Sequence, residues 1–260
     1  MMRYIVVILI GIVAGYAVFE TTLLVVRVRR GLAISAASRP FEANNPGALF
    51  SVLVIGDSTG VGTGAAGPEE SVAGRIFRDY PRVSIENHAE NGARMADIMG
   101  QLDEATKQDY HLILIQAGGN DILRWTDLSL LEQQARSLLQ ASVGRARHVI
   151  FISTGNVGLA PAFFWPLTGL YTTRTRAVRS RFIAVAKGEG VTYVDLFRER
   201  REDPFLDDPA RYYAKDLLHP GSEGYRVWYE ELSKQAHLAS LFPRNRKSPI
   251  TGGALKTRDP

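Results

Sequence analysis

The stretch of sequence that decides the fold is Val52-Leu53-Val54-Ile55-Gly56-Asp57-Ser58-Thr59. Its four apolar residues are typical of a strand that is buried on both faces of a parallel sheet. The glycine, aspartate and serine that follow place a hydroxyl group on a turn at the end of this strand. Binding sites in such sheets form at the carboxyl ends of the strands, so Ser58 is a candidate nucleophile.

Strand-like and helix-like segments alternate between residues 50 and 240. Strands are expected at Leu53–Ile55, Val83–Asn87, Leu112–Gln116, His148–Ser153 and Val191–Asp195. Helices are expected at Glu69–Tyr80, Ala93–Ala105, Leu128–Val143, Thr173–Lys187 and Ser222–Ala239. This alternation predicts an α/β fold with three layers, in which helices cover both faces of a five-stranded parallel sheet.

Two further motifs follow predicted strands. Gly118-Gly119-Asn120-Asp121 comes after the third strand, and Asp216-Leu217-Leu218-His219 lies between the fifth strand and the last helix. His219 has the chemistry to take a proton from Ser58, and Asp216 the chemistry to orient the imidazole. The amide of Asn120, with backbone N–H groups, has the chemistry to stabilise an oxyanion. Each motif alone is more typical of a turn, but their shared position at one sheet edge predicts a serine esterase.

Two other interpretations use the same glycine-rich stretch. Gly56-x-Ser58-x-Gly60 matches the nucleophile elbow of α/β-hydrolases, but in that fold several strands precede the serine, and the acid and the histidine lie far apart. Gly60-Val61-Gly62-Thr63-Gly64-Ala65 matches a dinucleotide-binding pattern, with Glu86 as the ribose-binding acid. That pattern leaves the two other motifs unused. His88 is the alternative to His219 as the catalytic base.

Over roughly residues 50–240 the chain resembles the SGNH hydrolases, also called GDSL-type hydrolases. The resemblance is carried, in the family's order, by Gly56-Asp57-Ser58, Asn91-Gly92, Asn120 and the Asp216/His219 pair. It implies a flavodoxin-like fold, a metal-free esterase, and an oxyanion hole built from the N–H groups of Ser58 and Gly92 with the side chain of Asn120. Thr59 replaces the usual apolar residue, and Leu217-Leu218 is bulkier than the common spacer. Both departures bear on substrate preference more than on mechanism.

An apolar segment precedes the domain. An uncharged run from Tyr4 to Phe19 is followed by Glu20 and by a second apolar run that ends at Val26. The whole stretch is long enough to cross a membrane if Glu20 lies near an interface. We expect residues 1–30 to be an uncleaved single-pass anchor, although a cleaved signal peptide has a similar pattern. Three arginines after the span, against Arg3 before it, favour a cytoplasmic domain, whereas an exported domain is common among hydrolases.

Composition assigns the remaining segments of the chain and limits the kinds of partner and cofactor that are expected. Residues 31–49 are expected to be a linker, residues 50–240 the hydrolase domain, and residues 241–260 a basic disordered tail. The two terminal segments, 1–30 and 241–260, carry net charges of +3 and +4, so the body carries −3 and gives no support to nucleic-acid binding. The chain has no cysteine, and no His, Asp and Glu cluster has metal-binding spacing, so neither a metal nor another cofactor is expected.

The sequence therefore predicts an enzyme that hydrolyses carboxylic esters through an acyl-enzyme, with Ser58, Asp216 and His219 as its catalytic residues. The substrate is expected to be a small acyl ester, such as an acetyl ester, or a lipid ester such as a lysophospholipid. Phe163, Phe164 and Trp165 follow the fourth strand and are candidates for contact with the substrate or with a membrane. The alternative function is that of a membrane-tethered binding domain that has lost catalysis.

Overall fold

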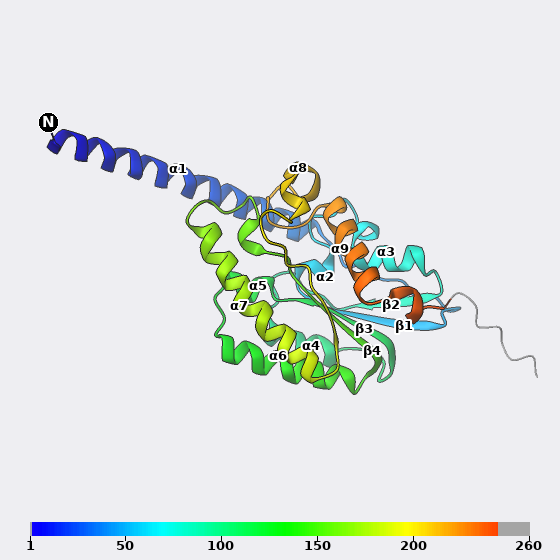
Figure 1. Ribbon diagram of the computed structural model, residues 1–260. Coiled ribbons are helices and arrows are strands. Elements are labelled where there is room, and N and C mark those ends of the chain that lie inside the picture. Colours follow the sequence, from blue (N-terminus) through cyan, green and yellow to red (C-terminus); the bar gives the residue numbers. More distant parts are fainter. Residues whose placement is uncertain (1, 244–260) are drawn as a thin grey trace, which may run out of the picture.

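The computed structural model describes residues 2–243 and places a five-stranded sheet at the centre of the domain (Figure 1). The strands are β1 (Phe50–Gly56), β2 (Val83–Asn87), β3 (Tyr110–Ala117), β4 (Ala146–Ser153) and β5 (Thr192–Val194). Their order is β2-β1-β3-β4-β5, and all neighbours are parallel. The predicted parallel sheet is confirmed. The strand order reverses between β1 and β3, which is where ligands bind in sheets of this topology.

Helices cover both faces of the sheet, as the sequence predicts. α4 (Met95–Asp103), α6 (Leu128–Val143) and α7 (Leu167–Gly188) pack on one face, and α3 (Val72–Asp79) and α9 (Ser222–Gln235) pack on the other. In β1, Leu53 and Ile55 belong to the first core and Val52 and Val54 to the second, because successive side chains of a strand point to opposite faces. This double burial explains why β1 is apolar at each of these positions.

Several short segments complete the fold. They are the helices α2 (Ser58–Val61), α5 (Gly119–Leu123), α8 (Pro209–Tyr212) and α10 (Leu238–Leu241), and the 3-10 turns Pro68–Glu70, Val157–Leu159 and Pro204–Leu206. The sequence analysis missed them because each is too short to have a helical period. The expected last helix ends early, at Gln235, because His237 takes a left-handed conformation (φ 50°) before α10.

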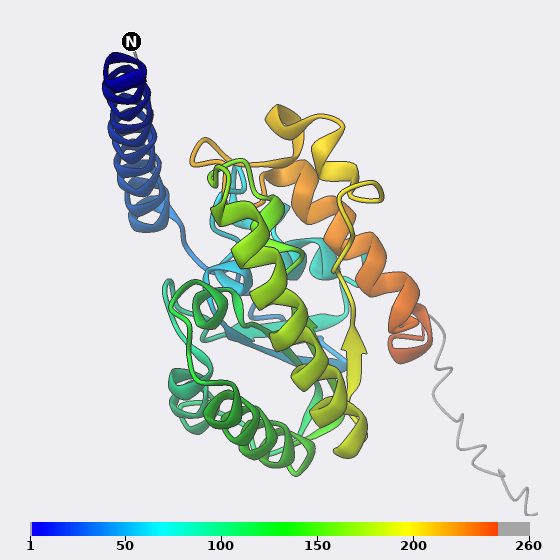
Figure 2. The same cartoon turned by 60° about the vertical axis from the view of Figure 1, so that its left-hand side comes forward.

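α1 (Met2–Ala37) is a long helix with two different parts. From Arg3 as far as Phe19 its residues are exposed on every side, and this half extends beyond the domain in both views (Figure 1, Figure 2). From Glu20 onward, residues at helical spacing are partly or fully buried; they are Glu20, Leu23, Leu24, Arg27, Gly31, Ile34 and Ser35. α1 is long and apolar enough to cross a membrane. A signal sequence near an N-terminus can have the same length and apolar composition.

The structure corrects the expected linker. α1 continues to Ala37, since the residues that follow Gly31 are good helix formers and the first proline after them is Pro40. Beyond the helix, the backbone of Ala43 exchanges two hydrogen bonds with Ile85, of 2.9 and 3.0 Å, so the chain covers the outer edge of β2. Residues 244–260, most of the expected tail, lie outside the described residues.

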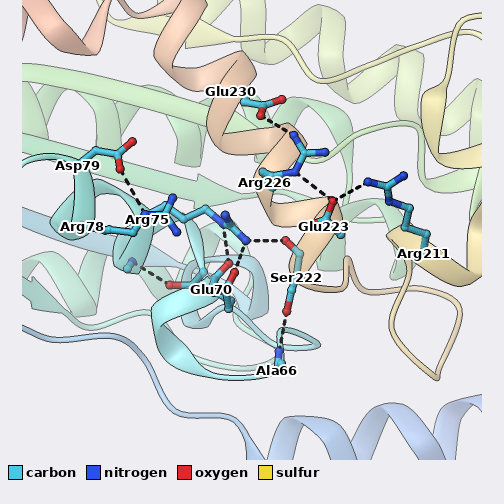
Figure 3. A network of polar contacts seen from close by, with 12 residues as sticks. Ala66, Glu70, Arg75, Arg78, Asp79, Arg211, Ser222, Glu223, Arg226 and Glu230 are labelled. Atoms are coloured by element: carbon cyan, nitrogen blue, oxygen red, sulfur yellow. Dashed lines mark hydrogen bonds and ion pairs between the residues drawn. The ribbon is translucent and has the colours of Figure 1, made fainter.

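Arg75 connects α3 to the start of α9 (Figure 3). Its side chain is almost fully buried, where it pairs with Glu70 and donates through Nη2 to the carbonyl of Ser222 (2.9 Å). The hydroxyl of Ser222 accepts a hydrogen bond from the backbone N–H of Ala66 (2.9 Å). Because Ser222 follows His219 closely in the chain, these bonds fix the loop that carries the histidine.

We predict that Arg75→Met lowers the free energy of unfolding by about 2–3 kcal/mol, because the carbonyl of Ser222 loses its charged donor. The control is Arg78→Met on the same helix, whose side chain is 54% exposed and whose loss should change stability by less than about 0.5 kcal/mol. Urea unfolding of both variants in one detergent measures the difference. Equal losses would contradict a special role for Arg75.

Candidate active site

The turn after β1 presents Ser58. Gly56 has φ 144°, and a Cβ there would lie 1.9 Å from the carbonyl oxygen of Gln116 in β3, so only glycine fits. Oδ1 of Asp57 caps α2 by accepting hydrogen bonds from the backbone N–H (2.9 Å) and the hydroxyl (2.7 Å) of Thr59. Thr59 is therefore polar because it helps to hold this turn. Within residues 2–243, the N–H of Ser58 bonds to no protein acceptor.

Ser58, His219 and Asp216 form a continuous line of hydrogen bonds. Oγ of Ser58 lies 3.0 Å from Nε2 of His219, although the two residues are 161 positions apart in the chain. Nδ1 of His219 lies 2.6 Å from Oδ2 of Asp216. This contact favours the tautomer that carries its proton on Nδ1, which leaves Nε2 as the acceptor that faces the serine. The structure thus brings together the three side chains that the sequence analysis selected.

Asp216 is buried, yet its environment favours the charged form. Burial by itself raises the pKa of the carboxyl, but hydrogen bonds from the imidazole and from the backbone N–H groups of Leu218 (3.0 Å) and His219 (3.1 Å) outweigh it, so the pKa lies below its ordinary value. The turn requires Leu217 to adopt φ 62°, a left-handed conformation in which glycine has no strain. The bulky spacer therefore holds its turn at some cost in backbone energy.

The carboxyl edge also holds Asn120, at the start of α5. Its amide lines the cavity beside Ser58 and donates to the carbonyl of Ala93 (3.0 Å), which leaves the second N–H for another acceptor. The bond to Ala93 links Asn120 to the residue after Gly92. Gly92 has φ 83°, and no hydrogen bond within the described chain uses its N–H. An amide and two backbone N–H groups are thus available as donors at this edge.

Two other carboxylates are fully buried and hold turns. Oδ2 of Asp57 accepts from the N–H of Gly119 (3.3 Å), which links the turns after β1 and β3. Asp121 accepts from the N–H of Met95 (2.9 Å) and the hydroxyl of Thr126 (2.8 Å). Burial raises the pKa of both carboxyls, against the effect of these hydrogen bonds. Their partners are neighbouring protein groups, which assigns them a structural role.

A cavity of about 190 Å³ opens from Ser58 and His219. Its apolar lining comes mainly from Leu123, Val157, Ala160, Leu196, Phe205, Leu218, Val227 and Trp228. Its polar lining away from Ser58 includes Thr154, Asn156, Arg198, Asp203, Tyr213 and Glu231. Arg198 pairs with Glu231 (2.9 Å), whereas burial raises the pKa of Asp203. The sequence analysis did not select Arg198, Asp203 or Tyr213, because the segment between β5 and the Asp216/His219 pair carries no motif, nor Glu231, which lies within α9.

Phe163, Phe164 and Trp165 lie outside the cavity, against the prediction that they contact the substrate. The ring of Phe163 packs on Tyr171, with centroids 4.6 Å apart, and the ring of Phe164 packs on Tyr16 of α1, at 6.3 Å. Trp165 is 80% exposed. The chain after β4 lines the cavity as far as Ala160 and only then turns toward α1.

α1 borders the catalytic residues, which the sequence did not indicate. Nη1 of Arg27 donates to the carbonyl of Ala162 (3.0 Å), and the carbonyl of Ser35 accepts from Nδ2 of Asn91 (3.0 Å). Between these contacts Gly31 faces Asp216. A Cβ on Gly31 would lie 3.2 Å from Oδ2, the oxygen that is bonded to His219. The second half of α1 is therefore one side of the site.

The glycines of the dinucleotide pattern are packed against protein. A Cβ on Gly60 would lie 2.7 Å from the side chain of Ala89, and one on Gly62 would lie 2.4 Å from that of Ser71. A Cβ on Gly64 would lie 2.4 Å from the carbonyl of Pro220. These glycines therefore serve close packing and leave no opening for a pyrophosphate, which removes the structural basis for nucleotide binding.

Glu86 and His88 belong to a separate cluster of hydrogen bonds. Glu86 accepts from the hydroxyls of Thr106 (2.6 Å) and Tyr110 (2.7 Å) and contacts Nε2 of His88 (2.7 Å). Burial opposes the charge of Glu86, but these bonds prevail and lower its pKa to about 2. Because Glu86 and His88 are engaged with each other, Glu86 is not free to bind a ribose and His88 is not free to act as a second catalytic base. The preference for His219 over His88 agrees with the geometry.

Gln101 in α4 supports the nucleophile turn and was missed by the sequence analysis. Its Oε1 accepts from the N–H of Gly56 (2.7 Å) and its Nε2 donates to the carbonyl of Gly56 (3.0 Å). The side chain is almost fully buried. The only available signal was a polar residue inside an otherwise apolar helix face, which does not by itself indicate a partner.

A hydrogen-bonded serine, histidine and aspartate at the carboxyl edge of this sheet define a hydrolase of the esterase type. The chain belongs to the GDSL-like lipase/acylhydrolase family, whose family model matches residues 54–227. The predicted membership of the SGNH hydrolases is confirmed. A comparison with curated proteins found no match.

Solved structures share the fold at low sequence identity. LAE5, an alpha/beta hydrolase enzyme from the metagenome of Lake Arreo in Spain, is 19% identical with a TM-score of 0.55, over 73% of this chain and 96% of its own. Axe2, an acetylxylan esterase from Geobacillus stearothermophilus, is 20% identical with a TM-score of 0.54, over 73% and 94%. A lipolytic G-D-S-L protein from Veillonella parvula is 17% identical with a TM-score of 0.55, over 71% and 96%.

We predict that Gly31→Leu lowers kcat/KM for an activated ester by about 10- to 100-fold, because the new side chain displaces Asp216 from His219. Gly15→Leu is the control, because no atom lies within 4 Å of a Cβ there. Wild-type activity in Gly31→Leu would contradict the contact.

Proposed function

We propose that this protein hydrolyses carboxylic esters through an acyl-enzyme formed on Ser58. The observation that carries the proposal is the 3.0 Å contact between Oγ of Ser58 and Nε2 of His219, with Asp216 on the far side of the imidazole. A serine hydroxyl is a weak nucleophile until an adjacent base removes its proton. Here the base, its orienting carboxylate and the hydroxyl lie in one line.

In the first half of the reaction, Nε2 of His219 takes the proton from Ser58 as Oγ forms a bond to the ester carbonyl carbon. Asp216 stabilises the resulting imidazolium through Nδ1. The tetrahedral intermediate collapses by breaking the bond to the alcohol oxygen, which leaves with the proton from Nε2. In the second half, a water molecule gives its proton to His219 and attacks the acyl-enzyme, which releases the acid and restores the serine.

The developing oxyanion is stabilised by the N–H groups of Ser58 and Gly92 and by the amide of Asn120. Support comes from the unbonded N–H groups of the first two residues within the described chain and from the remaining N–H of the Asn120 amide. A single donor in such a position contributes about 10²–10³ to kcat. The bond from Asn120 to Ala93 holds the amide in place before the substrate arrives, so little reorganisation is needed.

The size of the cavity supports a short acyl group. It measures about 190 Å³, and a cavity of about 150 Å³ is filled by one benzene molecule. A chain much longer than six carbon atoms therefore exceeds the space beside Ser58. The polar residues Asn156 and Asp203 further reduce the benefit of burying a long hydrocarbon there.

We predict that Ser58→Ala abolishes labelling by a fluorophosphonate and lowers kcat by at least about 10⁴, because no other group replaces the nucleophile. The matched control is Ser153→Ala, which removes a buried hydroxyl at the end of the neighbouring β4 and should leave the labelling intact. Mass spectrometry of the labelled peptide locates the reactive residue. Undiminished labelling of Ser58→Ala would reject the proposed nucleophile, and a folded wild type that never labels would favour a binding domain.

We predict that kcat/KM falls by at least about 10-fold from the acetyl to the octanoyl nitrophenyl ester, because about 190 Å³ does not hold eight carbon atoms together with the polar lining. The leaving group is constant, so the series isolates the acyl chain, and Ser58→Ala supplies the background rate. A preference for octanoyl would overturn the short-acyl assignment while leaving the mechanism intact.

A further inference from the structure

Apolar side chains are exposed around the start of α7. The ring of Trp165 is 80% exposed, Leu170 is 48% exposed and Trp125 is 47% exposed. Trp125 and Leu170 line one open apolar groove, and the ring of Phe164 next to them touches Tyr16 of α1. We call Trp125, Phe164, Trp165 and Leu170 the aromatic edge. Large apolar side chains gathered in this way on a surface mark an interaction site.

The position of the aromatic edge along α1 indicates what it contacts. Residues 3–19 are exposed on every side, and at about 1.5 Å per residue they are about 25 Å long, close to the apolar thickness of a bilayer. Glu20, the acidic residue of this helix, is only 9% exposed, and it is the first buried position after the exposed residues 3–19. The apolar face that lipid would surround therefore ends where the domain starts.

Tyr16 lies one helical turn before Glu20, about 6 Å nearer to the N-terminal end of α1. Phe164 touches Tyr16, so the loop before α7 reaches past the level of Glu20, and Figure 1 shows the start of α7 beside the middle of α1. Any bilayer that surrounds the exposed half of α1 must meet this loop. Arg27, Arg29 and Arg30 lie on the other side of Glu20, at the depth of lipid headgroups and water.

We propose that α1 crosses a lipid bilayer as far as Glu20 and that the aromatic edge is immersed in the surface of the same bilayer. Tryptophan side chains favour this depth because their rings are amphipathic, and an immersion of about 5–10 Å is usual for interfacial segments. A bilayer is favoured over a second protein because the aromatic edge continues the lipid-facing surface of α1. The proposal concerns the position of the domain on the bilayer, and it holds whether or not Ser58 is the nucleophile.

The proposed position of the domain brings the catalytic residues close to the membrane. Gly31, which faces Asp216, lies eleven residues after Glu20, or about 16 Å along the helix axis. The distance from the cavity to the hydrocarbon core of the bilayer is therefore about twice the thickness of the lipid headgroup region. Esters at the lipid surface would reach Ser58 without travelling through bulk water.

The three tryptophans of the chain allow a direct test. The full-length protein is placed in vesicles of phosphatidylcholine and phosphatidylglycerol that contain lipids brominated near the headgroup end of the acyl chains. In the variant with Trp125→Phe and Trp228→Phe, only Trp165 emits, and we expect bromine to quench about half of its fluorescence. In the control with Trp125→Phe and Trp165→Phe, only Trp228 emits; it is buried at the other face of the sheet and should not be quenched. Quenching of Trp165 no greater than that of Trp228 overturns the proposal.

A second comparison tests whether the whole aromatic edge is immersed. Leu170→Asp, in the background that retains only Trp165, should lower the bromine quenching by about half, because a carboxylate opposes immersion. Val143→Asp is the matched control: the side chain is 46% exposed, like that of Leu170, and lies at the far end of α6. Equal quenching in the two variants also overturns the proposal. Neither measurement requires catalysis, so failure of the esterase mechanism would be seen separately, by the absence of fluorophosphonate labelling.

Discussion

The hydrogen bond between Ser58 and His219 joins the first turn of the domain to its last loop, and other contacts at this edge keep the two groups within reach. Gln101 clamps the end of β1 from one face of the sheet, and Arg75 holds the start of α9 from the other. Gly64 lets the segment after α2 approach Pro220 so closely that a Cβ would lie 2.4 Å from its carbonyl. Two elements formed far apart in the chain are thus fixed against each other independently of the catalytic side chains.

The sequence selected residues that the structure brings together, because each one follows a strand in a fold whose strand ends share an edge. Asn120 and His219 could be selected from that rule and from the chemistry of their side chains alone. Gly92 needed the family resemblance, since a glycine after a strand has no chemistry of its own. Gln101 and Arg198 were not predictable, because their partners are backbone groups and carboxylates brought near only by tertiary packing. Phe164, a candidate for contact with the substrate or with a membrane, lies outside the cavity, since a position after β4 does not fix the direction in which the loop turns.

The two roles of α1 explain why its sequence is hard to interpret. A stripe that packs on a domain normally appears as a helical period of apolar residues. In α1 that stripe is hidden, because the opposite face is also apolar and because two of its contacting positions are Arg27 and Gly31. Composition therefore indicates a membrane segment and leaves the packed face unseen. The packing of Gly31 against Asp216 makes the helix that is a candidate membrane span also one side of the candidate active site.

The proposed short-acyl cavity and the proposed membrane contact together imply a substrate with two parts. About 190 Å³ beside Ser58 suits a short acyl group, whereas the aromatic edge lies outside the cavity and suits lipid. A long acyl chain would have to enter the cavity against Asn156 and Asp203, whose polar groups lose water without gaining a partner. An alcohol portion held at the lipid surface faces no such penalty, because it remains outside. Together, the proposed function and the proposed membrane contact favour esters whose short acyl group enters the domain while the larger alcohol stays at the membrane.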